Sequence, residues 1–309
     1  MTRSRETGDV GYRAYKKNYL INGGFDVWQR GDIVNGTSSK YTSDRWRLQS
    51  SAEPWTVDRI TNYVTVNSLK ITGTTAAVSG FRNFYQIVEN GSALMAGKQM
   101  TLSCRIRAST PLTAFFFVAD TSTGDDVGSP RQSDISITTV WQTFSWTTAA
   151  FDSTPSSTEV NKRVGLGNLA QLANAQWIEI EWFQLEEGTS ATEFEYVSPQ
   201  QNLAECQRYF ERIVVLGNNI ATIGQAVSTS AAISNLNYTV KRVNPTVTFS
   251  SGFVTTTAAG AAAGGTTGAD ITGLTSARIS VIGAAGLVGG NATCLVHPTS
   301  GFIDVDAEL

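Results

Sequence analysis

Hydrophobic and polar residues alternate along many short stretches between residues 18 and 197. The stretch TLSCRIRAS (residues 101–109) shows this most clearly, because apolar and polar side chains take turns along it. A period of two places successive side chains on opposite faces of a β-strand. The stretches are separated by clusters of Gly, Asn, Ser, Thr or Pro. Regularly spaced strands with turn residues between them predict an antiparallel jelly-roll β-sandwich over residues 18–197.

Two of these stretches carry further information. The run WIEIEWFQLEEG, which begins at Trp177, is the last of the series and is expected to close the sandwich. The run TAFFFVAD (residues 113–120) is apolar on both faces. A strand of that kind needs a cover on each side, so we expect one face to contact the core and the other to contact a neighbouring domain or subunit.

A helix is predicted over residues 198–212. Ser198 can cap its first turn, Pro199 suits the first helical position, and Gln201 stands where a capping box places Glu or Gln. Three apolar side chains then recur at helical spacing on one face, which indicates packing: Leu203, Cys206 and Phe210. The segment is expected to link two domains.

The composition changes after this helix. Residues 213–309 are rich in Ala, Gly and Thr and include the low-complexity tract TTTAAGAAAGGTTGADITGL. Strand-like stretches on both sides of the tract predict a C-terminal β-rich domain, so the whole chain is expected to be mainly β. Large apolar side chains are sparse there, so burial between subunits would have to supplement the core. We therefore expect an oligomer.

The first 17 residues carry Arg and Lys with few large apolar groups. Such a segment is either an arm that becomes ordered against a partner or a disordered start. It has no apolar run, which predicts no signal peptide.

Charge and cysteine content exclude several partners. Charged residues make up 16% of the 309 residues and the formal net charge is -3, without a dense basic cluster beyond the N-terminal segment. Binding to duplex nucleic acid, which requires many phosphate contacts, is not expected. No apolar stretch is long enough to predict insertion into a membrane. The three cysteines are far apart and odd in number, which indicates free thiols in a reducing compartment.

Catalytic chemistry has little support in the sequence. His297 is the only histidine, and no recognised nucleophile arrangement surrounds it. Glu179 and Glu181 should lie on one strand face at a separation that approaches the spacing used in glycoside hydrolysis. A solvent-exposed face on the last strand is the favoured explanation of the pair, and no sequence feature nearby indicates a cleft. We therefore expect a protein that is not an enzyme.

Several blocks of the chain resemble a widespread family of bacteriophage virion proteins. They occur in order within residues 18–212: NYLINGGFDVWQRG, YTSDRWRL, VENGSALMAGKQMTLSCRIRAS, WQTFSWT and QLEEGTSATEFEYVSPQQNLAECQRYF. Members are tail-fibre or minor structural proteins with a carbohydrate-binding-module-like jelly roll. The resemblance implies a virion component made in the host cytoplasm, a homotrimer that contacts other virion proteins through residues 1–17 and attaches to host surface glycans.

Two other functions remain open beside host attachment. One is a decoration or docking role on capsid or tail without receptor binding. The other is a polysaccharide depolymerase, which the lack of a catalytic constellation disfavours. The resemblance does not place a glycan contact on any residue.

Aromatic residues are the natural candidates for glycan contacts, because sugar CH groups stack on Trp or Tyr rings. Trp55 and Trp146 have polar flanks and are the two candidates, although burial would explain each of them as well. The remaining tryptophans stand in stretches where apolar and polar residues alternate and are expected in the core: Trp28, Trp46, Trp141, Trp177 and Trp182.

Jelly rolls that bind carbohydrate often hold a structural Ca²⁺ near the first strand through oxygen ligands. Asp26 and Glu186 could contribute to such a site here. Hydrogen bonding of these carboxylates to turn amides is the alternative, and no other cofactor is expected.

Overall fold

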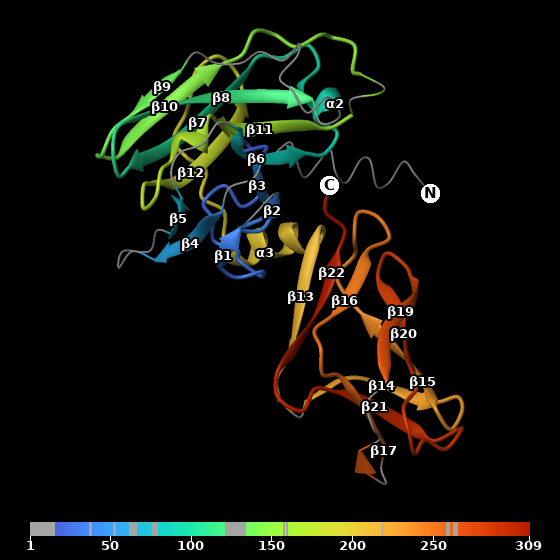
Figure 1. Ribbon diagram of the computed structural model, residues 1–309. Helices are drawn as coiled ribbons and strands as arrows, with labels where there is room; N and C mark the ends of the chain where they lie inside the picture. The colour runs from blue at the N-terminus through green and yellow to red at the C-terminus, as the bar shows by residue number, and fades with distance from the viewer. Residues whose placement is uncertain are drawn as a thin grey trace. The chain divides into compact units, whose positions relative to one another are not determined.

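The computed structural model describes residues 16–36, 39–51, 54–61, 67–75, 80–120, 134–156, 158, 160–217, 219–257, 260–261 and 265–309. The chain divides into two compact units, residues 1–202 and 203–309 (Figure 1). Every strand pair in the described parts is antiparallel. The mainly β fold class is therefore confirmed.

The first unit is a sandwich of two six-stranded sheets. One sheet has the order β1-β4-β5-β12-β7-β10, and the other β2-β3-β6-β11-β8-β9. The strand bounds of the first sheet are β1 Ile33–Gly36, β4 Trp55–Thr61, β5 Asn67–Gly73, β12 Trp177–Glu187, β7 Met100–Ala108 and β10 Gln142–Thr147. Those of the second are β2 Lys40–Tyr41, β3 Trp46–Ser50, β6 Arg82–Val88, β11 Lys162–Gly167, β8 Leu112–Asp120 and β9 Ile135–Ile137. Two short helical turns accompany them: α2 Gly91–Met95 and the 3-10 turn Leu169–Gln171.

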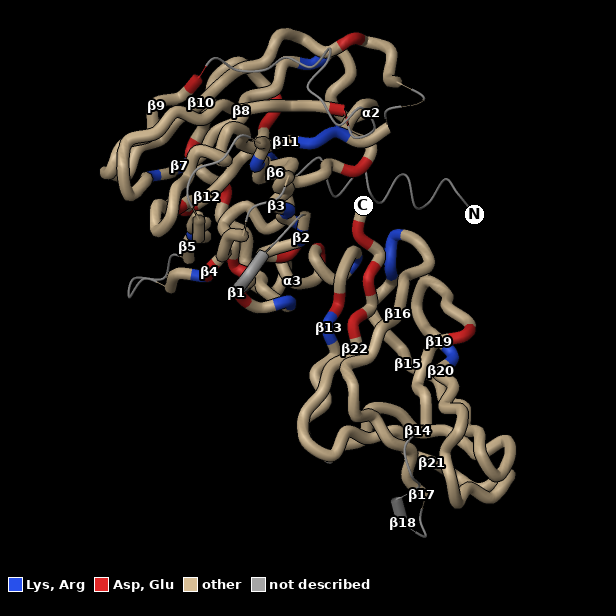
Figure 2. The backbone as a smooth tube through the Cα atoms, in the orientation of Figure 1, with Lys and Arg blue, Asp and Glu red and all other residues tan. Residues whose placement is uncertain are grey.

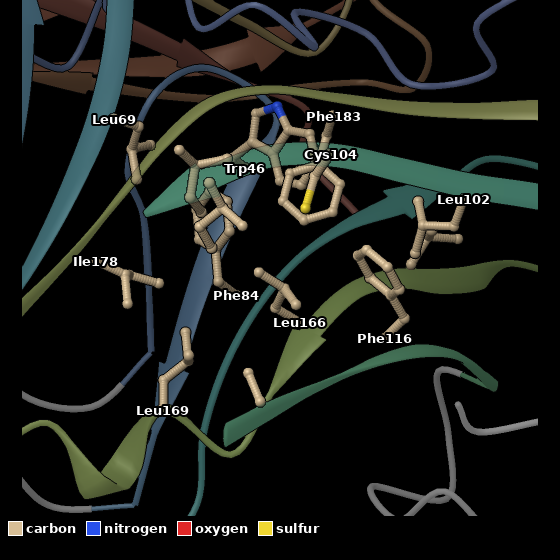
Figure 3. Packing of buried hydrophobic residues seen from close by; sticks show 14 of the residues in the cluster. Trp46, Leu69, Phe84, Leu102, Cys104, Phe116, Leu166, Leu169, Ile178 and Phe183 are labelled. Carbon is tan, nitrogen blue, oxygen red and sulfur yellow. The ribbon is translucent and has the colours of Figure 1, made fainter. Parts of the chain in front are cut away.

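Apolar side chains of both sheets fill the space between them. Trp46 is completely buried, with its ring centroid 4.9 Å from that of Phe84 and 5.2 Å from that of Phe183 (Figure 3). Every second residue of β7 joins this core, as the alternation predicts, and Cys104 is among them. Burial raises the pKa of the Cys104 thiol well above its ordinary value. Apolar burial of this kind is the main term that stabilises a sandwich.

Strand β12 lies inside the first sheet, between β5 and β7, so the run that starts at Trp177 forms a central strand. Segments near the start and the end of the first unit also contact β12. Asn18 donates to the carbonyl of Phe183 at 3.0 Å and accepts from the N–H of Leu185 at 3.0 Å. Residues 188–197, the return segment, pass back along the outer surface of β12, where the N–H of Glu195 donates to Gln184 at 2.8 Å.

The linking helix α3 spans Pro199–Gln207. Its predicted cap is confirmed, because the hydroxyl of Ser198 accepts from the N–H of Gln201 at 3.3 Å. The predicted end is wrong: Phe210 belongs to strand β13, and Leu203 is 38% exposed instead of packed. Only Cys206 of the predicted apolar stripe is buried within the helix.

The second unit contains two sheets, of three and seven strands. The small sheet has the order β13-β22-β16, with bounds Phe210–Val215, Gly301–Asp306 and Thr246–Phe249. The large sheet has the order β18-β17-β21-β14-β15-β20-β19. Its bounds are Gly260–Ala261, Val254–Thr257, Ala292–Val296, Ile220–Ala226, Ala231–Asn237, Ser276–Ile282 and Thr266–Thr272. The core of the second unit includes Leu236, Ile279, Leu295 and Ile303.

The large sheet of the second unit is almost free of charge (Figure 2). Asp270 and Arg278 are its only charged residues in the seven strand sequences, and they pair at 2.7 Å. Its solvent face exposes large apolar side chains, with Ile223 67% and Ile282 64% accessible. Both lie on the face opposite the core, since each follows the alternation from a buried neighbour.

The outer face of β8 differs from the expectation. Phe117 is only 2% exposed, and its ring lies 6.2 Å from that of Tyr85 and 6.4 Å from that of Phe115. The aromatic rings of the same sheet pack on one another, so the apolar run does not require a neighbouring subunit. The N-terminal arm lies outside the described residues up to position 15. No helix among the described residues is long and apolar enough to span a membrane.

Candidate functional site

The outer face of the first sheet carries a row of charged residues that crosses four strands. Strand register places Asp58 opposite Lys70, Lys70 opposite Glu179, and Glu179 opposite Arg107. The row thus alternates in sign along β4, β5, β12 and β7. Burial and the neighbouring Asp32 carboxylate raise the pKa of Asp58, while Lys70 opposes that rise.

Two tryptophans interleave with the cations of this row. The guanidinium of Arg107 lies 4.7 Å from the ring centroid of Trp141 and 5.5 Å from that of Trp177. The ammonium of Lys70 lies 5.3 Å from the Trp177 ring. Both indoles are partly exposed. Aromatic rings and cations therefore alternate from the start of β10 to β5, an arrangement that the ring quadrupole stabilises.

Glu179 is held below this surface. Its Oε2 accepts from Nε and Nη2 of Arg107 at 3.0 and 2.7 Å, and its Oε1 accepts from the hydroxyl of Ser68 at 2.6 Å. Its side chain is only 4% exposed, against 34% for Arg107. The carboxylate orients the guanidinium, and the guanidinium presents its remaining edge to solvent.

A β-bulge shapes the next part of the face. The register between β12 and β7 shifts between Ile180 and Trp182, so the extra residue Glu181 has no opposite partner. A bulge places two successive residues opposite one residue of the partner strand, so the alternation of side chains shifts by one residue beyond it. Glu181 forms an ion pair with Arg105, while Trp182 packs against Phe194 with ring centroids 5.1 Å apart.

Tyr196 borders this face at the return segment. Its ring is edge-on to that of Phe194 at 4.8 Å, and the residue is 71% exposed. Burial of part of the phenol and the nearby Glu181 carboxylate raise its pKa, which Arg105 partly opposes. Aromatic side chains therefore stand at two ends of the surface, with the arginines between them. We call this set the outer-face site: Lys70, Arg105, Arg107, Trp141, Trp177, Glu179, Glu181 and Tyr196.

The predicted glycan contact at Trp55 is wrong, because Trp55 is 0% exposed and packs in the core with Val57. A ring without accessible surface cannot stack on a sugar. Trp146 is half-buried and packs against the same core, on the inward side of β10 with Phe144. Neither residue joins the outer-face site.

Asp26 and Glu186 do not share a partner. Asp26 accepts from the amides of Asn67 at 2.8 Å and Asn202 at 3.2 Å. Glu186 accepts from the N–H and the hydroxyl of Thr192 at 2.8 and 2.6 Å. Calcium binding by these carboxylates stays a prediction. Within the part of the chain that is described, no group of three or more His, Cys, Asp or Glu could hold a metal ion.

Burial raises the pKa of Glu186, but the hydrogen bonds from Thr192 and Gln184 outweigh it and the pKa lies below its ordinary value. The carboxylate therefore stays charged while it fastens the return segment to β12.

The catalytic candidates have structural partners. His297 is 5% exposed, its Nε2 lies 2.8 Å from the carbonyl oxygen of Ser251, and its ring packs edge-on against Phe253. Glu179 and Glu181 both face outward, as predicted, and each is bound by an arginine.

Trp141 and Trp177 were expected in the core and instead form part of the site. The sequence feature that identifies them is strand parity, which means whether a residue shares its odd or even position along a strand with residues of the core face or of the polar face. Trp177 shares its parity with Glu179, and Trp141 shares its parity with Thr143, so both belong to the polar face. Trp55 has the parity of the buried Val57, and Trp146 that of Phe144.

No protein-family model matches the chain, and no curated protein sequence is detectably similar to it. Several solved structures align with about half of it. A structure described as "CBM4 structure and function" is 18% identical, with 54% of this chain and 98% of that chain covered and a TM-score of 0.34. The CBM22-1 xylan-binding domain of Paenibacillus barcinonensis Xyn10C is 16% identical, with 56% and 96% covered and a TM-score of 0.33. A putative sugar binding protein from Bacteroides thetaiotaomicron is 10% identical, with 56% and 100% covered and a TM-score of 0.37. Assignment of the site rests on the geometry of this chain.

Proposed function

We propose that the first unit binds a glycan on the outer-face site. The observation that carries this proposal is the alternation of partly exposed indoles and cations on one sheet face. Indole surfaces accept the CH groups of a sugar ring, and adjacent N–H donors hydrogen-bond its hydroxyl groups. The ion pairs with Glu179 and Glu181 hold the arginines in place before a ligand arrives, which lowers the entropy lost on binding.

The sequence resemblance supports a wider role for the chain. We infer a phage virion protein, a tail fibre, tail tip or spike subunit, that recognises host-surface glycans during adsorption. Such a subunit would bind without cleaving, and both carboxylates of the site are already engaged by arginines. The homotrimer remains part of the same proposal, supported by the apolar face of the second unit.

The direct test measures glycan binding by the full chain on a glycan array and by titration calorimetry. Trp141→Ala and Trp177→Ala should each weaken binding by about tenfold, which corresponds to about 1.4 kcal/mol. Phe81→Ala is the matched control, because Phe81 is 47% exposed and lies outside the site. Melting temperatures should stay close to that of the wild type in all three variants. Unchanged affinity in both Trp variants, or no glycan bound at all, would contradict the proposal.

A further inference from the structure

The ion pairs of the outer-face site are arranged asymmetrically with respect to solvent. Arg105 has 40% of its side chain exposed and its partner Glu181 has 18%, while Arg107 has 34% and its partner Glu179 only 4%. The carboxylates lie underneath and the guanidinium groups lie above. A ligand that approaches this face therefore meets the guanidinium groups before the carboxylates, although the two ion pairs contain equal numbers of each.

The cations also keep hydrogen-bonding capacity. A guanidinium has five N–H donors, and the hydrogen bonds of Arg107 to Glu179 use Nε and Nη2. The hydrogen bond of Arg105 to Glu181 uses Nε. Within the described residues, neither Nη1 of Arg107, nor the Nη atoms of Arg105, nor Nζ of Lys70 has a hydrogen-bond acceptor from the protein. Donors of two arginines and a lysine thus face solvent beside the two indoles.

From this arrangement, and resting on the proposed glycan-binding function, we propose that the outer-face site selects acidic glycans whose sugar units carry carboxylates. A sugar carboxylate is planar and charged and can accept two parallel N–H bonds from one guanidinium edge, one at each oxygen, whereas a hydroxyl group offers one neutral oxygen. The Trp141 and Trp177 rings would contact the sugar ring that bears the carboxylate. Glu179 and Glu181 contribute to this selectivity indirectly, because they hold the arginines in the orientation that a carboxylate requires.

The test compares uronate oligosaccharides as free acids with their methyl esters, which keep the backbone and lose the charge. Titration calorimetry on the full chain should show the free acid binding at least about tenfold more tightly than the ester, the factor expected from one charge-assisted bidentate contact. A sulfated neutral oligosaccharide is the third ligand and should bind less tightly than the uronate, because a sulfate ester is less basic than a carboxylate and accepts weaker hydrogen bonds from a guanidinium group.

Three variants assign the effect to the site. Arg107→Gln alone would leave the buried carboxylate of Glu179 without its cation, so Arg107→Gln is combined with Glu179→Gln. Lys70→Met removes a cation that has no hydrogen-bonded partner among the described residues. Arg278→Gln is the matched control, because Arg278 is similarly exposed and paired but lies on the second unit. The first two should lose the preference for the acid, and the control should keep it.

The possible outcomes separate the two proposals. Equal or tighter binding of the esters, with loss of binding in Trp177→Ala, would overturn acidic selectivity and leave the glycan site standing. Tighter binding of the sulfated chain would likewise overturn selection for carboxylates. If none of a panel of uronate oligosaccharides and esters binds, acidic selectivity fails, and the glycan-binding proposal fails with it only if the array also shows no bound glycan.

Discussion

At the scale of single residues, the buried carboxylate of Glu186 attaches the return segment to β12. It is 2% exposed, and its oxygens accept from both the N–H and the hydroxyl of Thr192 and from the amide of Gln184 at 2.9 Å. A carboxylate in such a cage is stabilised as the anion, so its folded-state pKa is lowered. The charge thus becomes part of the attachment of the return segment to β12.

We expect Glu186→Gln to lower the free energy of unfolding at pH 7 by about 2 kcal/mol, since hydrogen bonds to a charged acceptor are lost. Because the folded pKa lies below the unfolded one, this contribution is present above the ordinary pKa of a glutamate and disappears as the pH falls through the folded pKa. Urea unfolding between pH 3 and 7 would measure the loss. Glu187→Gln, at a neighbouring residue whose side chain is 53% exposed, should change little. An equal difference at pH 3 and pH 7 would contradict this account.

At the scale of elements, a lysine joins the linking helix to the small sheet of the second unit. The side chain of Lys241 is fully buried, and its Nζ donates to the carbonyl of Gln207 and to Glu211, both at 2.6 Å. Burial lowers the pKa of Lys241, and the Glu211 carboxylate opposes that shift. The ammonium lies at the C-terminal end of α3, where carbonyl groups without helical partners favour a cation.

Lys241→Met should destabilise the second unit by about 3 kcal/mol, because it leaves Glu211 without its cation. Adding Glu211→Gln should recover part of the loss. All seven tryptophans lie in residues 28–182, so tryptophan fluorescence follows the first unit, and circular dichroism follows both. The denaturation midpoint seen by circular dichroism should fall while the fluorescence midpoint stays. A parallel fall in both signals would contradict the assignment.

Strand parity predicts much of the first unit and also explains where prediction failed. It places the arginines of β7 on one face and Cys104 on the other, as observed. Applied to the tryptophans, it assigns Trp55 to the core, although its polar flanks suggested exposure, and Trp177 to the polar face, although its alternating stretch suggested the core. The position of Trp182 could not be read in this way, because the bulge at Glu181 changes the parity within β12. The helix cap could be predicted from the sequence because its residues interact locally. The helix end could not, because it depends on the pairing of Phe210 with Asp306 far along the chain.

At the scale of the whole molecule, the large sheet of the second unit presents a face that suits self-association. Ile223 and Ile282 are strongly exposed on it, and its only charged residues neutralise each other. An apolar, uncharged surface has no repulsion against a copy of itself and gains from removal of its area from water. This face is the natural contact for the proposed homotrimer.

If this face is the trimer contact, the double variant Ile223→Lys/Ile282→Lys should convert the proposed trimer to a monomer, because it places like charges on the surface that the copies would share. Val140→Lys changes an equally exposed residue of the first unit and should leave the trimer intact. Sedimentation velocity of the purified full chain at micromolar concentration would measure the mass. A monomeric wild type, or a double variant that remains a trimer, would contradict the proposal.

The two ends of the first unit meet on one strand, and this has a mechanical consequence. Asn18 is bonded to β12 at Phe183 and Leu185, and its N–H also donates to Glu195 of the return segment at 2.7 Å. A pulling force between residues 17 and 203 would therefore act on these few bonds and not on the ladders of the two sheets. In single-molecule stretching, release of the return segment should precede unfolding of the sandwich, and Glu186→Gln should lower the force of that first event. The residues of the outer-face site that lie on the strands would then stay in place, while Tyr196 would leave with the return segment.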